Sequence, residues 1–478
     1  MNQTRDETYH TIELEGHLTP EDKSVSSYRL LPFEVPAGMA RLEVSYRFSD
    51  DSPGGYMRPP GNILDIGLFD PRGSEFLRAR GFRGWSGSVR REFFLSSEDA
   101  TPGYLPGPIL PGQWEIVLGL YHILPHGCDY CVTISLFAGE PSNFVDVDLS
   151  PWPVSRRESG WYRGDLHCHT HHSDASGSLA DLVAAARAQH LDFLAVTDHN
   201  TISHLPHLAA QTGPDLLLIS GEEITTEQGH ANAWGIRRWH DFRCEDREQM
   251  AQVVADVWST GGLVSVNHPK EGGPPWLFGD EAQFDCLEVW QAPWFTFNDQ
   301  SLALWHRLLC RGHRITGVGG SDMHQPLFDG RVGRLAVGKP CTWIYAEELS
   351  VAGILAGIKA GHVYISEDVT GPKVFLNADA DDDGCFETMT GDLVKVPVGT
   401  RLVLRCRVIG AEACELCIRS KEKTFSVVVD RRDFTHEWTV RPKEDTFFRV
   451  EVVDRPEPPH VVVRALSNPI YVTIQPSR

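Results

Sequence analysis

The stretch from 164 to 201, GDLHCHTHHSDASGSLADLVAAARAQHLDFLAVTDHNT, most constrains the fold of this chain. It is typical of a strand end, a loop, a helix with apolar residues at helical spacing, a second strand and a second loop. Its two loops concentrate residue types that bind metals: His167, His169, His171, His172, Asp174, Asp198 and His199. Side chains at strand ends can converge, so the stretch predicts a site built there.

The same pattern recurs between residues 160 and 370. An apolar strand followed by a polar tip is repeated in DLLLISGEEITT, GLVSVNHP, CLEVWQA and ITGVGGSDMH. Helical stretches such as EDREQMAQVVADVWSTGG and NDQSLALWHRLLCRG lie between several of them. This alternation predicts parallel βα units and, repeated many times, a barrel.

The flanking regions have a different pattern. Short alternating strands separated by Gly/Pro-rich breaks fill residues 1 to 150, and β-type runs return from about 371 to 478. We therefore predict an α/β domain at 159–370 between a β-sandwich-like domain at 1–158 and a β domain at 371–478. No catalytic constellation is visible in the first region. The β domains could cover the site, mediate oligomerisation or bind polymers.

The composition limits which classes of molecule the chain is expected to bind. The formal net charge is −21, from 65 acidic and 44 basic residues, which disfavours binding to a nucleic-acid duplex. Bound cations would reverse the sign locally, so a small anionic ester stays compatible. No apolar run suits a membrane span, no apolar leader is visible, and 11 cysteines without regular spacing favour free thiols in a cytoplasmic protein. The oligomeric state stays open.

The strand tips together predict a metal centre. The pair His167 and His169 stands at i and i+2, so both imidazoles face one side of an extended strand. Further tips offer Asp198, His199, Glu222, Glu223, His230, His268, Asp322 and His324. Carboxyl ends of barrel strands lie on one face, where these residues would meet. They are too many for one tetrahedral ion, and bridging carboxylates favour two or three metals.

These motifs carry a family resemblance. DLHCHTHHSD, TDHN, GEE, NHP and SDMH resemble the motif blocks of the PHP (polymerase and histidinol phosphatase) superfamily of metallohydrolases. The continuations TTEQGHANAWG and KPCTWIYAEELSVAGILAGIKAGHVYIS look like its CehA/McbA-type branch. The resemblance implies an α/β fold, a distorted (β/α)7 barrel with metals at the strand C-terminal face, flanked here by the two all-β domains.

The resemblance also implies ligand roles. The first metal would be held by His167 and His169 and closed by Asp322, the second by His230 and His268, and Glu223 rather than Glu222 would bridge them. A third metal would be held by Asp174, His199 and His324. Some trinuclear members have a histidine where this chain offers Asp174. Asp198 would support its neighbours without binding metal, and His171 and His172 have no implied role.

The implied activity is metal-dependent hydrolysis. Two or three divalent ions (Mn, Zn or Fe) would provide a bridging hydroxide that attacks a phosphorus or carbonyl centre. Asp322 would accept or shuttle the proton, and His199 or His324 would protonate the leaving oxygen. Phosphodiester or phosphomonoester hydrolysis is favoured. A carbamate or carboxylic ester hydrolase is the alternative, and a non-catalytic scaffold that binds carbohydrate or protein is an alternative of another class.

Substrate contacts are less specific in the sequence. Lys270 follows NHP, and Arg331 and Arg334 follow SDMH, so all three are candidate phosphate contacts, although solvated loop charges explain them equally well. An aromatic cluster favours packing at the barrel rim over a pocket wall: Trp276, Phe278, Trp290, Trp294 and Phe295.

Overall fold

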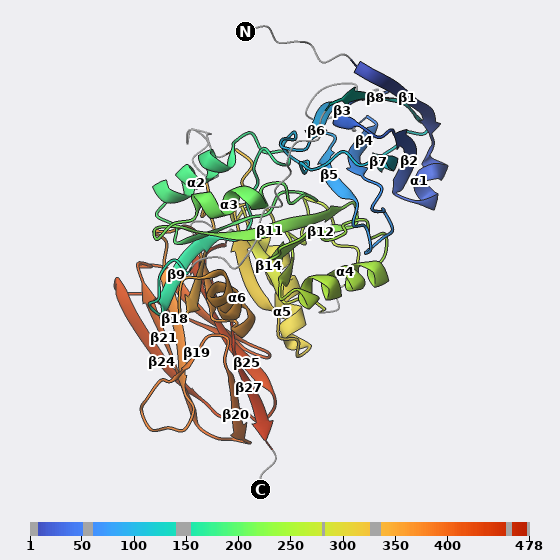
Figure 1. The fold of residues 1–478 in the computed structure, drawn as a ribbon. Coiled ribbons are helices and arrows are strands. Elements are labelled where there is room, and N and C mark those ends of the chain that lie inside the picture. Colours follow the sequence, from blue (N-terminus) through green and yellow to red (C-terminus); the bar gives the residue numbers. More distant parts are fainter. Residues whose placement is uncertain are drawn as a thin grey trace.

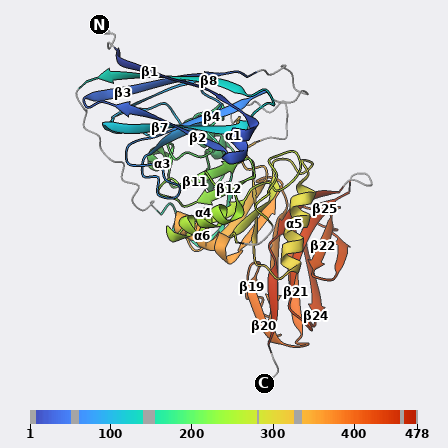
Figure 2. The same ribbon diagram turned by 90° about the vertical axis from the view of Figure 1, so that its right-hand side faces the viewer.

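The protein is described by a computed structural model that covers residues 8–50, 61–139, 154–279, 283–325, 336–455 and 461–475. Its sheets are stacked along the length of the molecule (Figures 1 and 2). The N-terminal strands form one end, the strands accompanied by most of the helices form the middle, and the C-terminal strands form the other end. The middle part carries the predicted metal ligands.

Two antiparallel four-stranded sheets face each other at the N-terminal end, around a common apolar core. The first has the order β1 (Thr8–Leu18), β8 (Cys128–Ala138), β3 (Met39–Phe48) and β6 (Glu92–Ser96). The second has the order β2 (Tyr28–Val35), β7 (Gly112–His122), β4 (Ile63–Phe69) and β5 (Phe82–Gly87), and α1 (Pro20–Val25) precedes β2. Strands β2 and β5 were not predicted, because a proline in YRLLPFEV and two glycines in FRGWSG obscure the alternation.

The middle part contains seven strands that pair in sequence order: β9 (Gly160–Asp165), β10 (Phe193–Val196), β11 (Leu217–Thr226), β12 (Gly229–Trp234), β13 (Leu263–Val266), β14 (Cys286–Gln291) and β15 (Thr316–Gly320). The described helices among them are α2 (Leu179–Ala188), α3 (Leu205–Gln211), α4 (Arg247–Ser259) and α5 (Asn298–Cys310). Strand β12 is antiparallel to both neighbours, whereas the other pairs are parallel. The βα repeat is therefore interrupted by a hairpin.

The first and last of these seven strands come together beyond their carboxyl ends. The backbone N–H of His169 donates to the carbonyl of Met323 at 3.0 Å, and that of Asp322 donates to the carbonyl of His167 at 2.8 Å. The two loops that follow β9 and β15 are thereby fixed to each other. The closed (β/α)7 barrel stays a prediction.

The sheet continues past the seven strands into the C-terminal part. Beside β9 lie β16 (Cys341–Ala346) and β17 (Val363–Ser366), joined by α6 (Val351–Ala360). Strand β17 pairs with β26 (Val462–Ser467), which pairs with β25 (Thr446–Asp454). Strand β25 pairs with β22 (Glu415–Ser420), and β22 pairs with β23 (Thr424–Val428). Strand β27 (Ile470–Gln475) also pairs with β25, and β20 (Leu393–Pro397) pairs with β27. A separate sheet contains β19 (Thr388–Met389), β18 (Lys373–Asp379), β21 (Leu402–Ile409) and β24 (Asp433–Val440). Pairing thus crosses the expected boundary at residue 370, and the three domain limits stay predictions.

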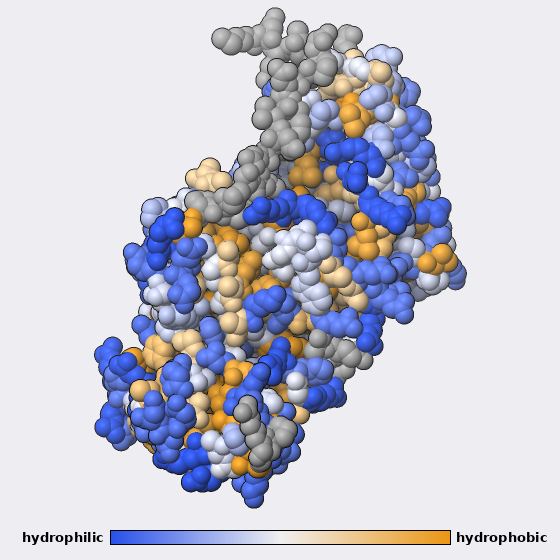
Figure 3. Space-filling view, turned by 60° about the horizontal axis from the view of Figure 1, so that its bottom comes forward, coloured by the Kyte–Doolittle hydropathy of each residue, from blue (hydrophilic) through white to orange (hydrophobic). Residues whose placement is uncertain are grey.

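The composition, with 23% charged residues, indicates a hydrophilic surface. The face drawn in Figure 3 is mainly hydrophilic, with hydrophobic residues in scattered patches. None of the described helices is long and apolar enough to cross a membrane. Within the described part of the chain, which includes all 11 cysteines, no disulfide is formed.

The N-terminal sandwich and the middle part share an apolar core. Phe69, Phe82 and Trp85 belong to the same buried cluster as residues of α2, β10 and β11. The ring of Phe82 stacks on Trp239 with centroids 4.0 Å apart, and Trp85 packs on Phe242 at 4.6 Å. This packing fixes the sandwich against the carboxyl-end loops of the middle strands.

Candidate metal centre

Glu223 on β11 lies at the centre of the predicted site. Its side chain is fully buried, and its two carboxylate oxygens face imidazole nitrogens from five histidines. The distances are 3.3 Å to His167 Nε2, 3.5 Å to His169 Nε2, 2.9 Å to His199 Nδ1, 3.3 Å to His230 Nδ1 and 3.4 Å to His268 Nε2. Glu223 lies on β11 and His230 on β12, whereas the loops after β9, β10 and β13 supply the other four side chains.

The neighbouring Glu222 points elsewhere, because successive residues of a strand alternate between faces. Its carboxylate accepts a hydrogen bond from the backbone N–H of His240 at 3.1 Å, and burial raises its pKa well above the ordinary value. Burial also acts to raise the pKa of Glu223, but the imidazoles of His167 and His199 outweigh it and hold this pKa well below the ordinary value. The pKa values of these two neighbouring carboxyls are therefore shifted in opposite directions.

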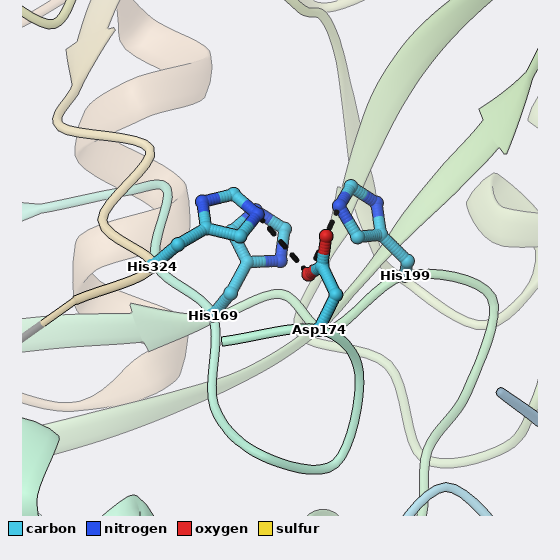
Figure 4. A group of neighbouring side chains, drawn as sticks. All are labelled: His169, Asp174, His199 and His324. Atoms are coloured by element: carbon cyan, nitrogen blue, oxygen red, sulfur yellow. Dashed lines mark ion pairs between the residues drawn. The ribbon is translucent and has the colours of Figure 1, made fainter. Parts of the chain in front are cut away.

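The other predicted carboxylates complete two further groups. Asp322 Oδ1 lies 3.0 Å from His169 Nε2 and 3.4 Å from His167 Nε2. Asp174 Oδ1 lies 3.1 Å from His324 Nε2 and 3.6 Å from His199 Nε2, and Figure 4 shows this carboxylate between the two rings. The structure brings all nine predicted ligands together, in groups whose ligand atoms lie within 4.8 Å of one another.

The donor atoms fit divalent cations. Several buried atoms have no hydrogen-bond partner: His167 Nε2, both ring nitrogens of His169 and of His230, His268 Nδ1, Glu223 Oε2 and Asp322 Oδ1. A buried polar atom without a partner is costly, and so many in one place require a common positive charge. Imidazole and carboxylate donors suit Mn, Fe and Zn. The identity and number of ions stay predictions.

Glu288 on β14 is a functional residue that the sequence reasoning missed. Its Oε1 accepts a hydrogen bond from His167 Nδ1 at 3.0 Å, and its Oε2 accepts one from the backbone N–H of His268 at 2.9 Å. The first bond assigns the proton of His167 to Nδ1 and leaves the Nε2 lone pair directed at Glu223 and Asp322. The available signal was an acidic residue inside the apolar strand CLEVWQ, where an unpaired charge would be costly.

Two amides support the ligand carboxylates in the same way. Asn267 Nδ2 donates to Glu223 Oε1 at 2.8 Å, and Gln291 Nε2 donates to Asp322 Oδ2 at 3.0 Å. Asn267 follows β13 and precedes the ligand His268, and Gln291 is the last residue of β14, which also contains Glu288. They fix the rotamers of the two carboxylates before any ion binds.

The backbone at the site is also specialised. A Cβ on Gly320 would lie 2.4 Å from the Cβ of His167 and 2.8 Å from Glu288 Oε1, so only glycine allows this approach. His268 and Asp322 have φ values of 30° and 53°, in the left-handed region that residues other than glycine rarely adopt. Such strain persists where surrounding contacts determine the geometry, as the bonds around these ligands do.

The remaining residues of the histidine-rich loop brace it. Asp198 accepts hydrogen bonds from Thr170 N and Oγ1, both at 2.8 Å, and from Ser173 Oγ at 2.7 Å. Its role therefore matches the supporting one implied by the resemblance. His172 Nδ1 lies 2.7 Å from Ser203 Oγ, and the ring of His171 stacks on that of His172.

Of the three predicted phosphate contacts, only Lys270 lies among the described residues. The ammonium of Lys270 donates to Gln291 O at 3.0 Å, Thr296 Oγ1 at 3.0 Å and Asn298 Oδ1 at 2.8 Å, so all three N–H bonds are used within the protein. Burial lowers its pKa to about 8. Its contact with a phosphate stays a prediction, and Arg331 and Arg334 lie outside the described residues.

A cavity of about 310 Å³ opens beside the third group of ligands. One side is formed by residues of the middle part, among them Asp174, His199 and His230. The opposite side belongs to the N-terminal sandwich, where the sequence showed no catalytic pattern. The aromatic cluster that was weighed as a pocket wall does not line this cavity: Phe278 and Trp290 are buried, and their rings pack on Trp276 and Trp294.

Comparisons with solved structures found similar chains at low identity. One is a two-domain protein from Bacteroides vulgatus containing a predicted PHP-like metal-dependent phosphoesterase, 16% identical over 70% of this chain and 100% of that chain, with a TM-score of 0.37. Another is an amidohydrolase from Chromobacterium violaceum with bound sulfate and no metal, 16% identical over 34% and 88%, with a TM-score of 0.26. A third is PliG of Aeromonas hydrophila, a periplasmic inhibitor of g-type lysozyme, 13% identical over 28% and 92%, with a TM-score of 0.16.

A comparison with curated proteins gave no match. The model of one protein family, the PHP domain, matches residues 165–240. This segment contains His167, His169, Asp174, His199, Glu223 and His230, and His268, Asp322 and His324 join them from later strands. The matched segment therefore resembles a PHP domain and contains six of the nine predicted ligands.

Proposed function

We propose that the chain is a metal-dependent hydrolase of the PHP type that cleaves phosphoesters. The observation that carries the proposal is the convergence of five imidazoles on the buried carboxylate of Glu223, with many of the donor atoms lacking a partner. The CehA/McbA-type branch, the closed (β/α)7 barrel and a cytoplasmic location belong to the same proposal. The contact between the loops after β9 and β15 supports the barrel.

Two or three divalent ions fit the ligand groups. His167, His169 and Asp322 would hold the first, His230 and His268 the second, and Glu223 would contribute to both. In the structure Glu223 forms one group with His167 and His268 and another with His199 and His230. Asp174, His199 and His324 would hold the third, which the ring of His169 also adjoins. When bound, such ions supply hydroxide near neutral pH and polarise the phosphoryl or carbonyl oxygen of a substrate.

Exposure separates ligands that only bind from those that can also exchange protons. The side chains of His167, His169 and Glu223 are fully buried, whereas those of Asp322, His199 and His324 are 19%, 20% and 28% exposed. These three can reach a substrate, and so can Asp174, whose side chain is 37% exposed and lines the cavity. Asp322 would accept the proton of the attacking water through Oδ1, since Gln291 occupies Oδ2. His199 or His324 would give a proton to the leaving oxygen.

Carbamate or carboxylic ester hydrolysis is the second candidate. It is favoured by one observation, that no lysine or arginine is among the described residues lining the cavity. A phosphate would then rely on the ions and on the loop that contains Arg331 and Arg334. Replacing Arg331 with alanine should weaken phosphoester hydrolysis more than carbamate hydrolysis; equal losses would contradict its role as a phosphate contact.

The proposal is tested by activity with matched variants. Metal-loaded protein should hydrolyse bis-p-nitrophenyl phosphate or p-nitrophenyl phosphate faster than a naphthyl carbamate. Glu223→Gln should lower the rate by about a thousandfold or more, because the ions lose a shared ligand. Glu222→Gln is the control: the same change one residue away, at a carboxyl that points away from the site and whose pKa burial raises, should leave the rate nearly unchanged. Activity retained in Glu223→Gln would contradict the proposal, and inactivity of loaded protein on all three esters would favour a binding scaffold.

A further inference from the structure

The N-terminal sandwich is clamped onto the loops that hold the metal ligands. The guanidinium of Arg90 donates to the carbonyl of Ser173 at 2.8 Å and also to that of His171. Gly103 N donates to Ser203 Oγ at 2.9 Å. A Cβ on Gly103 would meet the carbonyl oxygens of His172 and Trp85, each at 2.9 Å. A side chain at position 103 would collide with these carbonyls. The sandwich is therefore in direct contact with the loops beside the cavity.

The sandwich contributes an aromatic wall to the cavity. Tyr28 on β2, Trp85 on β5 and Tyr121 on β7 line it from one sheet, and the rings of Tyr28 and Trp85 meet edge to face at 6.4 Å. Aromatic faces carry negative partial charge and attract cations, ammonium groups in particular. The wall faces Asp174 and His199 across the cavity, so one small molecule can touch both sides.

Asp65 on β4 places a carboxylate in this wall without a matching cation. No described lysine or arginine forms an ion pair with it or lines the cavity; only the charge of His199 and a hydrogen bond with Ser88 act to lower its pKa. The other carboxylate on this side, Glu227, is already paired, since its Oε1 lies 2.6 Å from Lys23 Nζ. Burial and then the charge of Glu227 raise the pKa of Asp65 to about 7. A cation bound beside Asp65 would remove this cost.

We propose that the wall formed by Asp65, Trp85, Tyr28 and Tyr121 binds an ammonium group on the substrate, while the ester group lies at the metal centre. The inference rests on the proposed function and names its substrate class: an ester whose alcohol or acyl part carries a quaternary or protonated amine. Carboxylate and aromatic faces together are the usual chemistry for binding such a group. A second anionic group would meet Asp65 and no described cation, so the cavity selects against it.

A pair of probes that differ only in charge tests the proposal. Choline and 3,3-dimethylbutan-1-ol have the same shape, and their binding to metal-loaded protein can be measured by calorimetry without any turnover. We expect choline to bind at least about tenfold more tightly. In Asp65→Asn, which keeps the shape of the side chain, the preference should fall to about twofold or less. Asp129→Asn, the same change on an exposed strand residue of the sandwich, should retain the preference of the unmodified protein.

Three results would overturn the proposal. These are equal or tighter binding of the neutral alcohol, no binding of choline, and a choline preference that persists in Asp65→Asn. The corresponding phosphate esters, phosphocholine and 3,3-dimethylbutyl phosphate, then separate this inference from the proposed function. If neither ester is hydrolysed but choline still binds through Asp65, the hydrolase proposal fails and the ammonium site stands. If both are hydrolysed at equal rates and choline is not bound, the reverse holds.

Discussion

The two sides of the cavity are built in different ways. On one side, Asp174 and His199 follow strands of the middle part and His230 lies on β12, and each stands in a short motif: HHSD, TDHN and QGHAN. On the other side, Tyr28, Asp65, Trp85 and Tyr121 come from four strands of a sandwich, and no motif links them. The first side is a local property of strand ends, whereas the second exists only because one folded unit docks on another. The two sides should therefore respond differently to mutation.

The metal side should be sensitive to its supports as well as to its ligands. Glu288→Gln removes the charge that orients His167, and we expect the affinity for metal to fall by about 10- to 100-fold. Metal titration of the depleted protein measures this. Binding of choline by reloaded Glu288→Gln should stay close to that of the unmodified protein, because Glu288 does not line the cavity. A large loss of choline binding with normal metal affinity would break the distinction between the two sides.

The docking contact should affect the reaction without affecting the metals. Arg90→Gln removes the donor that joins the sandwich to the carbonyls of His171 and Ser173. The position of the wall relative to the loop that contains Asp174 is then no longer fixed by these hydrogen bonds. We expect kcat/KM to fall by about tenfold while metal content is retained. Arg78→Gln, at an exposed arginine of the same sandwich, is the control and should change neither. Loss of metal in Arg90→Gln would mean that the sandwich supports the ligands themselves.

These two sides also explain what the sequence could predict. The nine candidate ligands could be predicted because histidines and carboxylates at strand ends are recognisable one motif at a time, and the structure brings all nine side chains together. Glu288 was missed because a single acid in an apolar strand has no partner in the sequence. The wall was missed for a stronger reason: Asp65 and Trp85 lie on separate strands of the sandwich, and their common cavity depends on docking.

The fold divides in a similar way. Helical spacing in LADLVAAARAQHL was a local signal, and α2 forms as expected with Leu179, Leu182 and Val183 buried. The antiparallel β12 was not expected, because the repeat of strands and tips indicates parallel units, whereas GHANAW returns directly beside β11. Pairing of β17 with β26 joins residues about a hundred positions apart, which no local pattern can indicate.

The smallest expected effect concerns the cost of the wall to stability. Because the pKa of Asp65 is raised to about 7, the folded protein favours the protonated carboxyl. The contribution of this carboxyl to the free energy of unfolding is fully present below its ordinary pKa of 3.8 and is lost as the pH rises through 7. Above that pH the unmodified protein keeps an uncompensated charge. Asp65→Asn should therefore raise Tm by a few degrees at about pH 8 and leave it nearly unchanged at about pH 4. Equal shifts at both pH values, measured calorimetrically at constant metal content, would show that Asp65 is not the titrating group.

The metal content of the purified protein, measured by mass spectrometry after reloading and dialysis, tests the central claim most directly. We expect at least two ions of Mn, Fe or Zn per chain in the unmodified protein and in Glu222→Gln. We expect Glu223→Gln to lose the ions of the first and second groups together, because its carboxylate lies within reach of ligands of both. Fewer than one ion per chain in the unmodified protein, or full retention in Glu223→Gln, would contradict a metal centre organised around Glu223.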